Sequence, residues 1–199
     1  MERLPLYRVE YTDGKGTGVL AVSLVDMPAV ESDFIKFGKN DKVRRIDFSD
    51  EERHRVIGCV LRADFPIYRR TDDGYEYNVV FPRESILQLS QKMFSTGSFA
   101  VNNTQHDSTN DVSDKMEIAQ MFIKDTARGI SPAGFEDIED GSLFAEYHIK
   151  DNDLWKEIKD GKINGFSVEI NERLTLVDNT EDEILDLLQK INEKIKEKR

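Results

Sequence analysis

The sequence predicts an α+β fold that is mixed but mostly antiparallel, with two internal helices and a separate helix at the C-terminus. Short runs rich in β-branched and aromatic residues recur between Gly, Pro and Asp turns, and only two internal segments show helical spacing of apolar residues. The chain has 199 residues, of which 38% are hydrophobic, enough for one core. We expect a single domain over residues 1–177 and an amphipathic helix over residues 178–199.

Four strands are predicted in the first half of the chain, arranged as two hairpins. Tyr7–Tyr11 and Val19–Val25 flank a glycine-rich turn, and Val56–Ala63 and Tyr75–Phe81 flank a second turn that contains Pro66. No helix follows the glycines of the first turn, so they do not indicate a phosphate loop. The polar segment between the hairpins, residues 32–52, predicts a long surface loop.

The first helix is predicted to begin at Pro82, where a missing N–H has no cost, and to end at Gly97. Its apolar face comprises Ile86, Leu89, Met93 and Phe94. The polar segment from Ser98 to Asp114 predicts a loop.

The second half predicts strands at Met116–Ile123, Ser142–Ile149 and Ile163–Ile170, with a helix capped by Asp151 or Asn152 before the last strand. The strand–helix–strand order over residues 142–170 permits a parallel crossover. In the C-terminal segment an apolar stripe follows a capping box, which predicts a helix that packs on the domain or on a partner; the stripe comprises Ile184, Leu187, Leu188, Ile191 and Ile195.

Charge and cysteine content exclude several classes of function. The net charge is −11 and each basic cluster is short, so direct nucleic-acid binding is not expected. No apolar run approaches the roughly 20 residues of a membrane span, and we expect no signal peptide. The single cysteine, Cys59, permits neither an intramolecular disulfide nor a cysteine metal cluster. We interpret it as a small buried residue, with a Cys–His catalytic pair as the weaker alternative.

Of the three histidines, His106 has the sequence context most suited to catalysis. It lies in a polar segment after a helix, and histidine is the side chain best placed to take a proton near neutral pH. His54 lies in a charged run and is expected to be solvated, whereas His148 is either structural or a supporting member of a site. We predict neither a metal nor a cofactor site.

Acidic residues also cluster after His106. Asp107, Asp111 and Asp114 are interpreted as a solvated acidic loop rather than a loose cation site.

A candidate nucleophile, Ser167, lies in the run Gly165-Phe166-Ser167-Val168-Glu169. The strand period of two places Glu169 on the same face as Ser167. Serine needs an adjacent base to act as a nucleophile, and a strand serine considered alone is usually structural.

Several segments together resemble XkdF-type phage prohead serine proteases. The similar segments are 22–30, 58–61 with 65–69, 81–94, His106-Asp107, and 153–161 with 165–169. Their order and spacing over residues 20–170 are more specific than any single piece. That family is related in fold to herpesvirus assemblin.

The resemblance implies a β-barrel surrounded by helices and a serine endopeptidase that processes scaffold and capsid proteins. It implies His106 as general base and Ser167 as nucleophile. Glu169 is our candidate for the third member, with Asp107, Glu146 and His148 as alternatives. The expected partners are phage scaffold and major capsid protein, together with self-association, and the expected location is the assembling procapsid in the host cytoplasm.

Two other functions remain open at this point. One is a catalytically silent procapsid scaffold or capsid-binding protein of the same fold. The other is an unrelated binding module.

Overall fold

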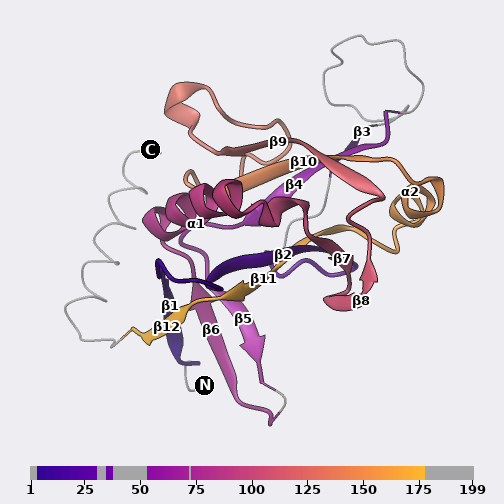
Figure 1. Ribbon diagram of the computed structural model, residues 1–199. Coiled ribbons are helices and arrows are strands. Elements are labelled where there is room, and N and C mark those ends of the chain that lie inside the picture. Colours follow the sequence, from indigo (N-terminus) through magenta and orange to yellow (C-terminus); the bar gives the residue numbers. More distant parts are fainter. Residues whose placement is uncertain (1–3, 31–34, 38–52, 72, 178–199) are drawn as a thin grey trace.

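The computed structural model describes residues 4–30, 35–37, 53–71 and 73–177 (Figure 1). The predicted C-terminal helix over 178–199 and most of the predicted loop over 32–52 lie outside these residues. The helices are α1 (Arg83–Thr96) and α2 (Asn152–Lys159), with short 3-10 turns at Ser98–Ala100 and Thr126–Arg128. The strands are β1 (Leu6–Glu10), β2 (Gly18–Val25), β3 (Ile35–Phe37), β4 (Arg55–Leu61), β5 (Ile67–Arg70), β6 (Glu76–Val80), β7 (Asn102–Thr104), β8 (Asp107–Asp111), β9 (Met116–Ile123), β10 (Leu143–Ile149), β11 (Gly165–Asn171) and β12 (Arg173–Leu176).

The strands form three four-stranded sheets, which confirms the predicted α+β class. Their orders are β12-β1-β6-β5, β3-β4-β10-β9 and β11-β2-β7-β8. Pairing is antiparallel except between β1 and β6 and between β2 and β7, so two of the sheets are mixed and β3-β4-β10-β9 is antiparallel throughout. The pairings of the described strands do not close a barrel.

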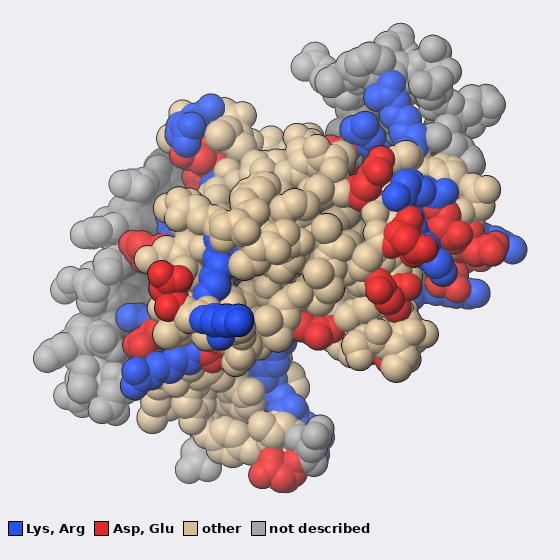
Figure 2. All heavy atoms as spheres, viewed as in Figure 1, with Lys and Arg blue, Asp and Glu red and all other residues tan. Residues whose placement is uncertain are grey.

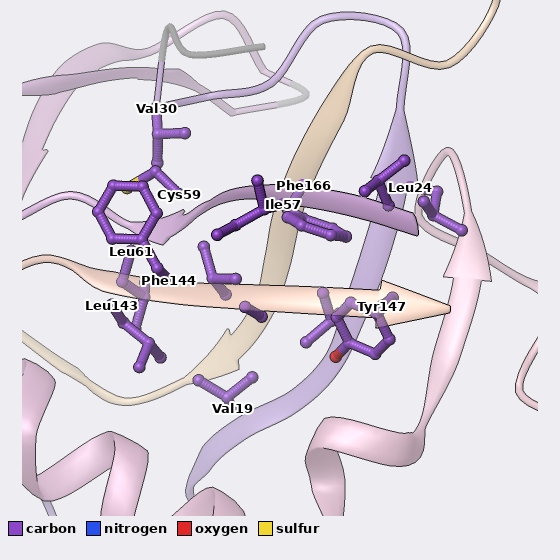
Figure 3. Close-up of a cluster of buried hydrophobic side chains, with 14 of the residues drawn as sticks. Val19, Leu24, Val30, Ile57, Cys59, Leu61, Leu143, Phe144, Tyr147 and Phe166 are labelled. Carbon is purple, nitrogen blue, oxygen red and sulfur yellow. The ribbon is translucent and has the colours of Figure 1, made fainter. Parts of the chain in front are cut away.

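The core lies between the sheets and α1 (Figure 3). On β2, Val22 and Leu24 are fully buried in this core, and Phe166 joins them from β11 with its ring 5.3 Å from that of Tyr147. Because side chains alternate along a strand, Ser23, which lies between Val22 and Leu24, faces the other side of the sheet. Ser167, which follows Phe166, faces that side too. The core packing therefore fixes which face of β2 and β11 is polar.

Both helices lie where the sequence predicts them, but α1 begins at Arg83, so the prediction that Pro82 is its first residue is wrong by one position. Pro82 precedes α1, and Gly97 ends it in the left-handed conformation at φ 75°. Asp151 caps α2 by accepting a hydrogen bond from the backbone N–H of Leu154. One member of the predicted apolar face of α1 is wrong, because Phe94 is exposed and contacts the ring of Phe99 instead.

Both predicted hairpins of the first half are wrong in their pairing. Strands β1 and β2 belong to different sheets, and β6 pairs with the short strand β5 rather than with β4. Sequence proximity suggested these pairs. In the structure, β2 instead forms its antiparallel backbone hydrogen bonds with β11, and β4 forms them with β10, both from the C-terminal half. Likewise, no parallel crossover joins β10 to β11, because these strands lie in different sheets.

The predicted loop over Ser98–Asp114 contains a hairpin, β7–β8. Its strands are short and polar, so they lack the apolar alternation by which a strand is recognised. Strand β7 is nevertheless held in place by parallel pairing with β2.

Cys59 is fully buried in β4, as predicted, and burial raises the pKa of its thiol to about 12. A thiol in this environment stays protonated at neutral pH, which argues against a Cys–His nucleophile.

Acidic and basic side chains are interspersed around a broad uncharged area on the face shown in Figure 2. This arrangement offers no continuous positive surface on that face. Among the described residues, no helix is long and apolar enough to cross a membrane.

Packing at Phe166 should dominate local stability. We expect Phe166→Ala to lower the free energy of unfolding by about 3–5 kcal/mol, because it removes a fully buried ring from the core. Leu87→Ala on the exposed side of α1 is the matched control and should change it by less than about 0.5 kcal/mol. Urea denaturation measures both, and equal effects would contradict the described core.

Candidate functional site

The candidate site lies on the polar face of the sheet β11-β2-β7-β8. Strand register places Ser167 of β11 opposite Ser23 of β2, and Ser23 opposite Asn103 of β7. Paired residues in neighbouring strands point to the same face, with Cβ atoms about 5 Å apart. Three polar side chains from distant parts of the sequence are therefore aligned across three adjacent strands.

Glu169 extends across β2 to reach this row. It lies two residues after Ser167, on the same face, and its register partner on β2 is Ala21. Because the Ala21 side chain is only a methyl group, the Glu169 carboxylate can pass over it. Glu169 Oε1 accepts hydrogen bonds from Asn103 Nδ2 at 2.6 Å and from Ser23 Oγ at 3.4 Å.

His106 comes to the same point from the turn between β7 and β8. Thr104 pairs with Asp107, which leaves Gln105 and His106 as a two-residue loop with φ of 55° and 57°. Positive φ at both positions is the pattern of a type I′ hairpin turn, usually formed by Asn-Gly. A non-glycine residue there costs about 1 kcal/mol or more.

This turn directs the imidazole back over β2. His106 Nδ1 lies 3.0 Å from Ser23 Oγ and 3.8 Å from Glu169 Oε1. The His106 side chain is 42% exposed, and its Nε2 has no hydrogen-bond partner among the described residues. One ring nitrogen thus faces a hydroxyl and a carboxylate, and the other is available for a reacting group.

The electrostatic surroundings of His106 favour its neutral form. Partial burial lowers the pKa of its imidazole below the ordinary value of 6.5, Glu169 opposes this shift, and the positive charge of Arg69 on β5 adds to it. Arg69 itself is partly buried, which lowers the pKa of its guanidinium, and it forms no ion pair with the described carboxylates. A neutral imidazole is the form that can accept a proton.

Ser167, the predicted nucleophile, lies beside this network without a hydrogen bond to it. The residue is 4% exposed, and its hydroxyl contacts no donor or acceptor of the described residues. The hydroxyl bonded to His106 is that of Ser23, which is fully buried. The structure therefore brings His106 and Glu169 together and places Ser167 one strand away from the Ser23 contact.

The other candidates for the third catalytic residue interact with residues outside this site. Glu146 forms an ion pair with Arg55 at 2.9 Å, and His148 Nδ1 lies 3.2 Å from Glu117. The carboxylate of Asp107 is exposed and accepts hydrogen bonds from Thr109, which lower its pKa.

The remaining predicted candidates also lie apart from the site. The expectation that His54 is solvated is wrong, because its ring stacks on Trp155 with centroids 4.9 Å apart. Among the described residues, no three His, Cys, Asp or Glu side chains are grouped as metal ligands.

Sequence reasoning missed three residues of this site: Ser23, Asn103 and Arg69. Ser23 carried a detectable signal, since a single hydroxyl interrupts the apolar run Val22-Ser23-Leu24-Val25. Asn103 and Arg69 carried none, because only the parallel pairing of β2 with β7 and the placement of β5 bring them near His106.

No family model, curated protein or solved structure matches this chain.

Removing one charge at a time should move the His106 pKa in opposite directions. Glu169→Gln removes the carboxylate that favours the imidazolium, so the pKa should fall further. Arg69→Gln removes a like charge, so the pKa should rise. NMR titration of labelled histidine measures both shifts, with Glu84→Gln on α1 as a distant control. Shifts of the same sign in the two variants would contradict the described surroundings.

Proposed function

We propose that the chain is a serine endopeptidase in which Ser167 is the nucleophile, His106 the general base and Glu169 the carboxylate that orients it. One observation carries the proposal: His106 presents Nδ1 to Glu169 and Ser23, on the sheet face that also bears the Ser167 hydroxyl. In the serine protease triad the base turns Nδ1 toward a carboxylate and uses Nε2 for the nucleophile. The same division of the two ring nitrogens is available here.

The reaction follows from these roles. His106 Nε2 takes the Ser167 hydroxyl proton as Oγ bonds to the scissile carbonyl carbon, which gives a tetrahedral oxyanion. The C–N bond then breaks, and the departing amine takes the proton from His106. Water hydrolyses the acyl-enzyme ester by the same route, with His106 accepting its proton and returning one to Ser167. Because Ser167 and His106 are not hydrogen-bonded in the free protein, this scheme requires a side-chain adjustment when substrate binds.

The biological setting of the proposal comes from the resemblance to XkdF-type phage prohead proteases. On this basis the substrates are phage scaffold and major capsid proteins, cleaved inside the procapsid in the host cytoplasm. The same proposal includes a barrel-like, assemblin-related arrangement of the three sheets, self-association, and a partner-contacting helix over residues 178–199.

A catalytically silent scaffold or capsid-binding protein is the second candidate. The observation that favours it is the state of Ser167, which is 96% buried and not bonded to His106. Under this alternative the buried polar row holds the β7–β8 hairpin on β2 and no bond is cleaved.

Cleavage assays separate the two candidates. The chain is co-expressed with a tailed-phage scaffold and major capsid protein, and products are identified by gel and intact mass. The endopeptidase proposal expects cleavage by wild type and a loss of at least about 10³-fold in Ser167→Ala and His106→Asn. Asparagine tolerates positive φ, so His106→Asn should remain folded.

Ser108→Ala on the exposed strand β8 is the matched control and should keep full activity. A fluorophosphonate should label wild type at Ser167. Absence of both cleavage and labelling in wild type would favour the silent alternative.

The pH dependence of cleavage should report the His106 environment. The base must be neutral to act, so kcat/KM should fall as the pH decreases through the His106 pKa, which lies below 6.5. The acidic limb should move to lower pH in Glu169→Gln and to higher pH in Arg69→Gln. An acidic limb well above 6.5 in wild type would contradict the assignment of His106 as the base.

A further inference from the structure

We infer that Ser23 is a positioning residue that links Glu169 to His106 and fixes the imidazole as the tautomer with hydrogen on Nδ1. The inference rests on the proposed function, since it assigns a role to a residue that does not itself react. It follows from the hydrogen-bond pattern around one fully buried hydroxyl on β2.

The proton count around Ser23 determines the direction of each hydrogen bond. A serine hydroxyl has one proton to donate and lone pairs to accept. Ser23 Oγ donates to Glu169 Oε1 at 3.4 Å, and a carboxylate can only accept. With the Ser23 proton assigned to Glu169, the contact of 3.0 Å between Ser23 Oγ and His106 Nδ1 has Nδ1 as its donor. A neutral histidine with hydrogen on Nδ1 has its lone pair on Nε2.

The Glu169 carboxylate alone is too far from His106 to fix the tautomer of its ring. Glu169 Oε1 lies 3.8 Å from His106 Nδ1, beyond normal hydrogen-bond range, whereas Ser23 Oγ is within range of the ring. Glu169 is held in place by Asn103 Nδ2 at 2.6 Å, so its acceptor oxygen is fixed beside Ser23. Ser23 therefore completes the connection between the carboxylate and the base.

Burial of Ser23 separates its role from that of Ser167. Ser23 is 0% exposed, so its hydroxyl is bonded to His106 and Glu169 rather than to bulk water. Ser167 lies opposite in the register and makes neither contact. Two serines on neighbouring strands thus receive different roles, positioning for Ser23 and nucleophilic attack for Ser167.

The test compares removal of each hydroxyl. Long-range ¹H–¹⁵N spectra of labelled histidine report the tautomer directly, and loss of a signal in His106→Asn assigns His106. Wild type should show hydrogen on Nδ1, and Ser23→Ala should shift the population toward hydrogen on Nε2. Ser167→Ala should leave the tautomer unchanged while cleavage is lost. If wild type carries hydrogen on Nε2, or if Ser23→Ala does not alter the tautomer, the inference is overturned.

Kinetics supply a second readout. With a fluorogenic peptide that spans the mapped cleavage site, Ser23→Ala should lower kcat by about 10- to 100-fold with little change in KM, the size of effect seen when a group that orients a metal-bound histidine is removed. Ser23→Thr keeps the hydroxyl and should restore both the tautomer and most of kcat. If Ser23→Ala does not fold, Ser23→Cys replaces it, since a thiol is a weak donor. Unchanged kcat in a folded Ser23→Ala or Ser23→Cys would also overturn the inference.

Failure of the proposed function and failure of the Ser23 assignment give different results. If neither wild type nor any variant cleaves a substrate, the proposed function fails. The tautomer comparison still decides in that case whether Ser23 positions His106. If a fluorophosphonate labels Ser23 in wild type and in Ser167→Ala, Ser23 is the nucleophile and its positioning role is refuted.

Discussion

The candidate site depends on the position of β2 between β11 and β7. Along this strand the side chains alternate, so the residues that anchor the core, Val22 and Leu24, force Ser23 to the opposite face. A shift of one residue in register would turn Ser23 into the apolar core and Leu24 toward the polar row. The hydrophobic effect that selects this register therefore also selects which hydroxyl meets His106.

The turn that carries His106 is locally unfavourable, and its surroundings hold it in place. Gln105 and His106 both adopt positive φ, where glycine or asparagine would be less strained. Strand β7 is held by parallel pairing to β2, and Gln105 N–H donates to Leu24 O at 3.0 Å. These bonds fix the turn from one side, so the imidazole projects over Ser23. Strain that is retained in this way is common at functional sites, because the geometry it produces is needed there.

Sequence periodicity predicted the strands with apolar alternation and both helices, including the end of α1 at Gly97 and a start of α2 at Asp151 or Asn152, of which Asp151 is the cap. It did not predict the partners of the strands. The pairs β2–β11 and β4–β10 join segments over 80 residues apart, and nothing local in the sequence encodes such pairing. The strand period placed Glu169 and Ser167 on one face. It could not indicate that Ser23, about 140 residues earlier, would lie between them and His106.

A base that works near neutral pH needs an environment that balances opposing charges. Glu169 orients the ring through Ser23, but its negative charge favours the imidazolium, as does the net charge of −11 on the whole chain. Partial burial and the guanidinium of Arg69 act in the other direction and outweigh Glu169, since the pKa of His106 is lowered overall. Arg69 can do this because no described carboxylate neutralises it. An orienting carboxylate and a neutral base are compatible here because partial burial, with a smaller contribution from the Arg69 charge, outweighs the negative charge of Glu169.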